Sequence, residues 1–540
     1  MSHFEDHLMV APIILPLFAG AVMLVLGGER RRNVNAALNI AACLALIAIS
    51  VVLIRKADAS PTGLTGVYRL GNWPAPFAIV LVVDRLAALM VLLTSLLATA
   101  AAVFSLARWY RAGVLFHPLF QFLLMGINGA FLTGDLFNLF VFFEVLLAAS
   151  YGLAMYGSGA ARVMAGMHYI VINLAASLLF LIGVGLIYGV SGTLNMADLA
   201  ARIPAIRAED RAYFEAGAGI LGIAFLVKAG MWPLCFWLPG TYAAAPPPVA
   251  SMFAILTKVG AYIVLRLSLL LFGPEAGASA QLGSDLLLFG GIATVMFGTI
   301  GSLASQDTAR LAAFSVLVSS GTVLAAIGMG QPAMTGAALF YIISSTLGLS
   351  AFFLLLELGE RGREPGADMI AVTREVYGEE NELEDSAEVG IATPATMSIL
   401  GLAFIGCALV ISGLPPLSGF IAKFALLRAA IDSGSDGVSA SGWIFMAVLI
   451  LSGLAALLAM SRAGIQAFWA APERTVPRVR VVEMTPVIAL LFLCAIQTVQ
   501  AGPIMRYMRA TAQSLHAPQD YIRGVLRPAT AQMHHREGGA

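Results

Sequence analysis

Residues 133–152, TGDLFNLFVFFEVLLAASYG, decide the fold. After Asp135 the run is almost entirely apolar over roughly 20 residues, the length that an α-helix needs to cross a lipid bilayer. It contains one charged side chain, Glu144, near its middle. A carboxylate at that depth is costly unless it faces a polar interior, so the run predicts a membrane-spanning helix that carries a functional charge.

The same apolar pattern recurs along the 540 residues, of which 59% are hydrophobic and 11% charged. The blocks are too long for the alternating ten-residue strands of an outer-membrane barrel, so they predict an all-α polytopic membrane protein of about fourteen spans. The predicted spans lie near 8-27, 35-54, 78-106, 113-133, 136-156, 163-190, 214-237, 249-272, 284-304, 309-329, 333-358, 394-427, 443-469 and 484-508.

Charge and cysteine usage exclude several classes of function. Basic and acidic residues balance at 31 each, so no net field favours nucleic acid. The four cysteines lie in apolar stretches without C-x-x-C spacing, which excludes iron-sulfur, zinc and disulfide frameworks. We therefore expect no cofactor, and no carboxylate cluster identifies a metal site.

The distribution of arginine predicts the orientation in the cell inner membrane. Loops after odd-numbered spans hold 14 arginines, whereas loops after even-numbered spans hold six basic residues. The positive-inside rule places the odd side in the cytoplasm and both termini outside, with the first span retained. The C-terminal tail does not follow the positive-inside rule in this orientation, because it carries Arg506, Arg509, Arg523, Arg527 and Arg536.

Two predicted spans are interrupted by prolines. The seventh is broken between Met231 and Pro239, and the twelfth between Gly413 and Gly419. Proline removes a backbone donor, and broken helices at corresponding places in two halves of a transporter usually mark the transport path. Ordinary proline kinks in packed helices are the alternative.

Most of the lysines in the chain lie inside apolar spans. The chain has four lysines, and three of them, Lys228, Lys258 and Lys423, lie inside apolar spans. Each costs about 2.5 to 3.5 kcal/mol at the bilayer centre on insertion scales. Lysine loses its proton on burial more readily than arginine, so a path that loads and unloads protons favours lysine. Snorkelling to an interface is the alternative.

Glu144 needs a cation, and Lys228 is the best candidate, so we expect the two to form a pair. Asp135 is expected to cap the helix that contains Glu144. His168 begins a polar stripe on the sixth span and is a candidate proton relay, although a helix–helix hydrogen bond fits it equally well.

Four motifs in chain order carry a family resemblance: 133–145 (TGDLFNLFVFFEV), 227–234 (VKAGMWPL), 257–262 (TKVGAY) and 413–424 (GLPPLSGFIAKF). They closely resemble the antiporter-like subunits shared by respiratory complex I and the Mrp multisubunit cation/proton antiporters. The run 137–144 and the acidic loop ahead of 392–397 look most like the D subunits of the Mrp antiporters.

The resemblance implies two inverted five-helix repeats, spans 4-8 and 9-13, in which helices 7 and 12 are broken. The corresponding regions are an N-terminal three-helix region (1-110), a first repeat (111-273), a second repeat (284-470) that includes the acidic cytoplasmic loop 360-390, and a C-terminal helix with a basic tail (471-540).

The resemblance also implies a function for the buried charges. Glu144, Lys228, Lys258 and Lys423 match the proton-path positions of the family, and Ser344 stands where relatives often carry a histidine. The link from Lys258 to Lys423 would then depend on hydroxyls and water.

The implied protein is a secondary transporter subunit and not an enzyme. It would move protons within a multisubunit Na⁺ or K⁺/H⁺ antiporter, together with the other Mrp-type subunits. The alternative is a membrane-arm subunit of complex I, or of a related membrane-bound hydrogenase, in which redox chemistry elsewhere supplies the energy.

Overall fold

The computed structural model describes residues 7–28, 31–109, 113–361, 389–390, 394–432, 437–468, 476–477 and 479–527. In these residues, 12 helices are long and apolar enough to cross a membrane. The shorter apolar helices Ala11–Val25 and Phe116–Leu132 bring the number of spans to fourteen. The prediction of an all-α polytopic membrane protein is confirmed. The core of the acidic loop, residues 362–388, lies outside the described residues.

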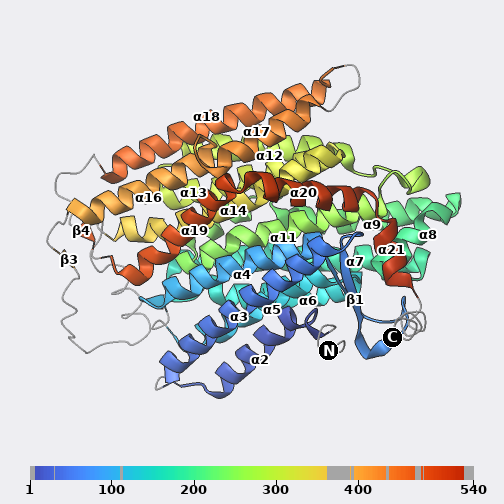
Figure 1. Ribbon diagram of the computed structural model, residues 1–540, viewed down its shortest axis with the longest axis horizontal. Coiled ribbons are helices and arrows are strands. Elements are labelled where there is room, and N and C mark those ends of the chain that lie inside the picture. Colours follow the sequence, from blue (N-terminus) through green and yellow to red (C-terminus); the bar gives the residue numbers. More distant parts are fainter. Residues whose placement is uncertain are drawn as a thin grey trace.

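The spans run roughly parallel to one another (Figure 1). They are α2 (Ala11–Val25), α3 (Arg32–Ala59), α4 (Arg85–Ser105), α5 (Phe116–Leu132), α6 (Leu136–Ala154), α7 (Ala160–Ser191), α9 (Ala208–Ala229) with α10 (Trp237–Ala244), α11 (Pro247–Leu271), α12 (Ser284–Ala304), α13 (Thr308–Gly328), α14 (Pro332–Glu360), α16 (Pro394–Ser412) with α17 (Ser418–Ile431), α18 (Ala440–Phe468) and α19 (Val481–Val499).

Short elements connect the spans. They are β1 (Leu64–Arg69), η2 (Leu70–Asn72), β2 (Val80–Asp84), α8 (Met196–Arg202), η4 (Ile203–Ala205), η5 (Gly277–Ser279), β3 (Val389–Gly390) and β4 (Val476–Pro477). Two further helices, α20 (Ala501–His516) and α21 (Gln519–Leu526), follow the last span. β1 and β2 form an antiparallel hairpin, and β3 pairs antiparallel with β4.

Two predicted spans have different bounds in the structure. The third, 78-106, begins as β2, and its helix starts only at Arg85. A short apolar run such as Val80–Val83 fits a strand as well as a helix, and the Asp84 side chain ends the strand by accepting from Ala87 N and capping α4.

The last predicted span, 484-508, is divided between two helices. α19 ends at Val499, and α20 begins at Ala501 in a new direction. Pro503 follows directly and has no backbone N–H to continue the helical ladder of α19, so the apolar run turns where a straight span was expected.

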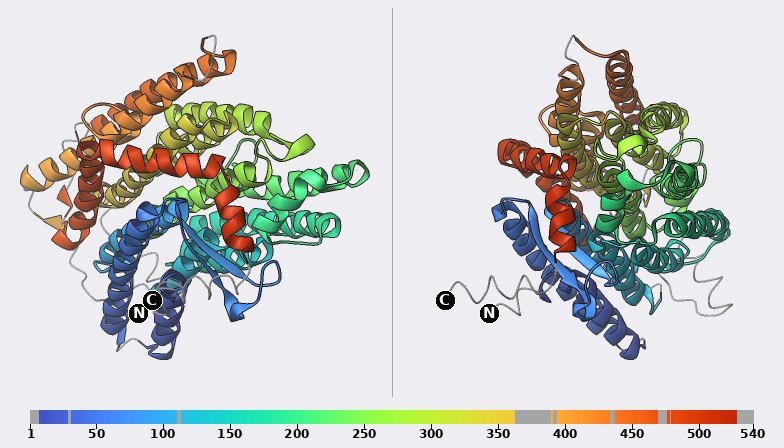
Figure 2. Two further views of the ribbon diagram at one scale, coloured as in Figure 1. Left: turned by 45° about the vertical axis from the view of Figure 1, so that its right-hand side comes forward. Right: turned by 90° about the vertical axis from the view of Figure 1, so that its right-hand side faces the viewer.

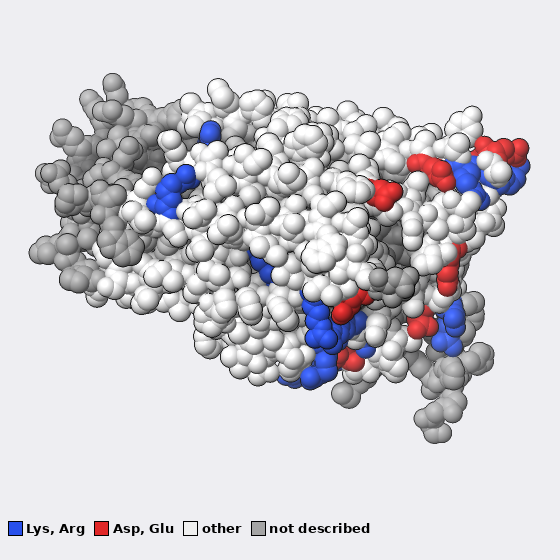
Figure 3. Space-filling view, turned by 90° about the horizontal axis from the view of Figure 1, so that it is seen from above, with Lys and Arg blue, Asp and Glu red and all other residues white. Residues whose placement is uncertain are grey.

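α11 and α14 form the centre of the bundle. In each, 94% of the most apolar 18-residue window is buried within the protein, compared with 33% for α3 and 39% for α18. Both views of Figure 2 show the outer helices surrounding this centre. Figure 3 shows a face whose middle is mostly uncharged, with charged side chains gathered toward one end, as expected for a surface in contact with lipid.

Both described chain ends meet at the β1–β2 hairpin. The ring of His7 lies 5.9 Å from that of Tyr68, and Arg69 donates to Val525 O of α21 at 3.1 Å. We call this the hairpin end of the molecule. An even number of spans places the two termini on the same side of the membrane.

A buried ion pair fixes the hairpin end to the central helix. Arg266 of α11 donates through Nη1 and Nη2 to the two carboxylate oxygens of Asp84, at 2.7 and 2.9 Å. The arginine side chain is 6% exposed and the aspartate 14%. Tyr262 OH accepts from Arg266 Nε and donates to Phe131 O, so the guanidinium is held on two sides.

We predict that Asp84→Asn destabilises the protein strongly, because it leaves the Arg266 charge buried without a counter-ion. Breaking a buried pair in this way costs about 3–5 kcal/mol. The matched control is Asp198→Asn, whose partner Arg202 is 47% exposed, and which should cost no more than about 1 kcal/mol. Thermal unfolding of the purified chain measures both, and equal losses would contradict the assignment.

Candidate functional site

α6 places Glu144 inside the bundle. Asp135 caps this helix as predicted, because its Oδ1 accepts from Phe137 N and Asn138 N, both at 2.9 Å. Glu144 lies nine residues later, and its Oε1 is buried without a hydrogen-bond partner among the described residues. An unpaired buried oxygen of this kind is normally satisfied by water.

Lys228 lies in the last turn of α9, directly before the first break. Gly230 has a φ of +72°, a left-handed conformation that ends the helix at little cost in a glycine. Ser320 of α13 donates to the carbonyl of Ala229, and Thr294 of α12 accepts from Trp232 N at 2.8 Å. The free carbonyls of a helix C-terminus favour a cation, so the break itself helps to compensate Lys228.

Glu144 and Lys228 do not form the closed pair that the sequence predicts. Lys228 Nζ is buried and makes no hydrogen bond within the described residues. The ammonium lies 5.1 Å from the centroid of the Phe143 ring instead. The aromatic face partly compensates the cation, and the carboxylate stays separate.

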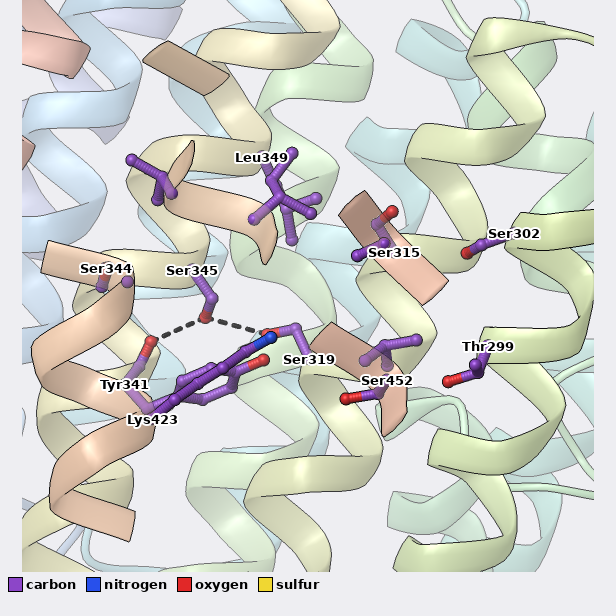
Figure 4. Close-up of a pocket in the computed structure, with 15 residues that line it drawn as sticks. Thr299, Ser302, Ser315, Ser319, Tyr341, Ser344, Ser345, Leu349, Lys423 and Ser452 are labelled. Atoms are coloured by element: carbon purple, nitrogen blue, oxygen red, sulfur yellow. Dashed lines mark hydrogen bonds between the residues drawn. The ribbon is translucent and has the colours of Figure 1, made fainter. Parts of the chain in front are cut away.

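Lys258 is fully buried on α11 and heads a chain of hydroxyls. Its Nζ donates to Ser319 Oγ at 2.8 Å, Ser319 donates to Ser345 Oγ at 2.8 Å, and Ser345 donates to Tyr341 O at 2.7 Å. Figure 4 shows the last two bonds. The donors all point in the same direction, from α11 through α13 to α14.

Gly260 allows the backbones of the two helices that carry Lys258 and Lys228 to approach closely. A Cβ atom at this glycine would lie 2.7 Å from Ala229 N, closer than real Cβ contacts allow. α11 therefore approaches the end of α9 closely at this point. The two lysines come from helices that touch where the first broken helix ends.

The hydroxyl chain opens into a small cavity that contains Lys423. The cavity has a volume of about 30 Å³, room for roughly two waters. Lys423 of α17 donates to Ser412 O at 2.8 Å, across the second break, and is 8% exposed. Hydroxyl groups dominate the rest of the lining: Thr299, Ser302, Ser315, Ser319, Tyr341, Ser344, Ser345 and Ser452 (Figure 4).

The two candidate relay residues lie in different places. Ser344 lines the cavity and shares a hydrogen bond of 2.8 Å with Ser418, the first residue of α17. His168 is exposed on α7, and its Nδ1 lies 3.0 Å from Met164 O of the same helix. No described contact connects His168 to the three lysines or to Glu144.

Sequence reasoning expected hydroxyls between Lys258 and Lys423 but named only Ser344, and not the serines that follow Lys258 in the structure. Ser319 and Ser345 each belong to a Ser-Ser pair inside an apolar span, at 319–320 and 344–345, and these pairs were the available signal. It also missed the ion pair between Arg266 and Asp84.

The arrangement suits proton movement. Lysines, one carboxylate, hydroxyls and a space for water can pass protons without a redox group. Among the described residues no three histidine, cysteine, aspartate or glutamate side chains lie close enough together to hold a metal ion.

Comparison with known proteins identifies the family. The family model described as NADH:quinone oxidoreductase/Mrp antiporter, TM, matches residues 133–455. A protein of Rhizobium meliloti (strain 1021), named as the D subunit of a probable K(+)/H(+) antiporter, is 58% identical over 97% of this chain and 98% of its own.

More distant relatives match over nearly the same length. The D subunit of the Na(+)/H(+) antiporter of Alkalihalophilus pseudofirmus (strain ATCC BAA-2126 / JCM 17055 / OF4) is 33% identical over 97% of this chain and 100% of its own. A chain of the Mrp complex from Dietzia sp. DQ12-45-1b superposes with a TM-score of 0.81 at 26% identity, over 97% of this chain and 99% of its own. The chain therefore belongs to the NADH:quinone oxidoreductase/Mrp antiporter family and, within it, to the antiporter D subunits.

Proposed function

We propose that this chain is the proton-translocating subunit of a multisubunit monovalent cation/proton antiporter. The observation that carries the proposal is the chain of hydrogen bonds from Lys258 through Ser319 and Ser345 into the cavity of Lys423. Three buried lysines and one partly buried carboxylate in a lipid-spanning bundle are unfavourable unless they have a function, and proton transfer gives each of them one.

In the proposed path a proton moves along the middle of the membrane. Glu144 controls the charge on Lys228, Lys228 and Lys258 exchange protons through water near Gly260, and Lys258 passes them through the serine hydroxyls to Lys423. The open contact between Glu144 and Lys228 is one state of this path, and closing it would hold a proton on Lys228. The chain itself needs no cofactor for these steps.

Potassium is the first cation to test. The relative named for K⁺/H⁺ exchange shares 58% identity with this chain, compared with 33% for the one named for Na⁺/H⁺ exchange. The full-length likeness to D subunits favours an antiporter over a complex I membrane arm. We further propose that both chain ends face the outside of the inner membrane, which is the orientation that the positive-inside rule favours for this distribution of arginines.

The proposed organisation is a pair of inverted repeats, 111-273 and 284-470, between an N-terminal region (1-110) and a C-terminal region (471-540). In each repeat the fourth span is the broken one, α9 with α10 and then α16 with α17. Each break carries a lysine beside the free carbonyls of a half-helix, Lys228 in the first and Lys423 in the second.

We predict that Lys228→Ala and Lys423→Ala each lower cation/proton exchange by more than about tenfold and leave complex assembly intact, because the charges serve the path and not the packing. The assay is cation-dependent dissipation of a pH gradient in vesicles from cells that express the whole set of subunits. Lys56→Ala changes the lysine that lies outside the apolar interior and is the matched control. Assembled Lys228 or Lys423 variants with normal exchange would remove that residue from the path.

We also predict different outcomes for two substitutions of Glu144. Glu144→Gln keeps the volume and removes the charge that acts on Lys228, so exchange at neutral pH should nearly disappear. Glu144→Asp keeps the charge with a shorter reach and should retain partial exchange with an altered pH profile. Equal exchange by the two variants in the same vesicles would mean that Glu144 serves only as a hydrogen-bonding residue.

A further inference from the structure

The C-terminal arginines that contradict the positive-inside rule lie on a distinct structural unit. α20 follows α19 and lies on the outside of the bundle, between α19 and α21 (Figure 1). Along its length His516 bonds to Thr335 of α14, and Tyr507 OH donates to Arg85 O of α4. α20 also contacts α11. It therefore lies across the bundle instead of continuing the last span.

α20 has one buried and one exposed face. Its buried residues are Met508, Thr511, Ala512 and Leu515, which recur at the spacing of a single helical face. The opposite side exposes Arg506, Arg509 and Gln513. An amphipathic helix with basic residues on its polar face is typical of segments that lie in the plane of a membrane interface.

The segment that contains α20 and α21 carries a net positive charge. Residues 501–527 contain four arginines, at 506, 509, 523 and 527, and one acid, Asp520. Within the described part of the chain, none of these four guanidinium groups is recorded in a hydrogen bond or an ion pair. Burial lowers the pKa of His516 to about 4, so at neutral pH the positive charge comes from the arginines alone.

Exposed aromatic residues lie on the adjoining hairpin. Trp73 and Phe77, between β1 and β2, are 65% and 82% exposed. The hairpin packs against α21 through Val80, Val82 and Val525, and both views of Figure 2 show them side by side. Tryptophan and other amphipathic aromatic side chains prefer the boundary between headgroups and acyl chains.

We propose that α20, α21 and the tip of the β1–β2 hairpin form a surface that binds the headgroups of anionic phospholipids. The arginines at 506, 509, 523 and 527 bind headgroup phosphates, and Trp73 and Phe77 enter the boundary beneath them. A phospholipid presents a phosphate beside an apolar chain, which matches a surface that carries both guanidinium groups and exposed aromatic rings. Free phosphate matches only the arginines.

The test measures thermal unfolding of the purified full chain in detergent with added phosphatidylglycerol or with phosphatidylcholine of the same acyl chains. For the wild type, the anionic lipid should raise the unfolding temperature by about 2–4 °C more than the neutral one. Arg506→Gln/Arg509→Gln should lose at least half of this difference, and the corresponding lysine variant should retain most of it. Because the two lipids are compared within each variant, a general loss of stability cancels.

The matched control is Arg202→Gln/Arg207→Gln, which removes two charges at the same end. These arginines are already paired with Asp198 and Asp210, so the lipid preference should not change. Trp73→Ser/Phe77→Ser should weaken the effect of both lipids. An unchanged preference in Arg506→Gln/Arg509→Gln, an equal loss in the control, or equal stabilisation by inorganic phosphate would overturn the proposal.

Discussion

The cost of keeping three lysines inside a lipid-spanning bundle governs this structure. Each ammonium is compensated by a different device. Lys228 lies at the carbonyl end of a broken helix and over the Phe143 ring, Lys258 donates to a serine, and Lys423 donates to a carbonyl across the second break. The prolines and glycines that follow α9 and α16 end these helices, and the carbonyl groups exposed at the breaks help to stabilise the buried ammonium groups.

The two halves of the proposed path differ in their hydrogen bonding. From Lys258 to Tyr341 the hydrogen bonds form an unbroken series, and a cavity with room for water continues to Lys423. On the other side, Glu144 and Lys228 stand apart with unsatisfied polar atoms. A path with one connected half and one open half can be switched by a small movement of one side chain, and Glu144 is the charge placed to cause it.

The sequence predicts the spans well, because roughly twenty apolar residues leave few alternatives to a transmembrane helix. It fails where an apolar run is short, as at Val80–Val83, or where a helix turns without a charged break, as at Gln500. It identifies the four charges, because a lone charge in an apolar span is conspicuous. It does not identify Ser319 or the Arg266–Asp84 pair, because hydroxyls are common in spans and the two ion-pair partners are 182 positions apart.

The proposed path depends on the hydroxyl link between Lys258 and Lys423, and a substitution of Ser319 breaks the first bond of that link. Ser319→Ala removes the acceptor of Lys258, whereas Ser315→Ala removes a hydroxyl of the same cavity that, among the described residues, bonds only to Leu311 O of its own helix. When cation-driven proton exchange is measured in vesicles, we expect a loss of more than about tenfold for Ser319→Ala and near-normal exchange for Ser315→Ala. Equal exchange rates for the two variants would contradict the proposed path.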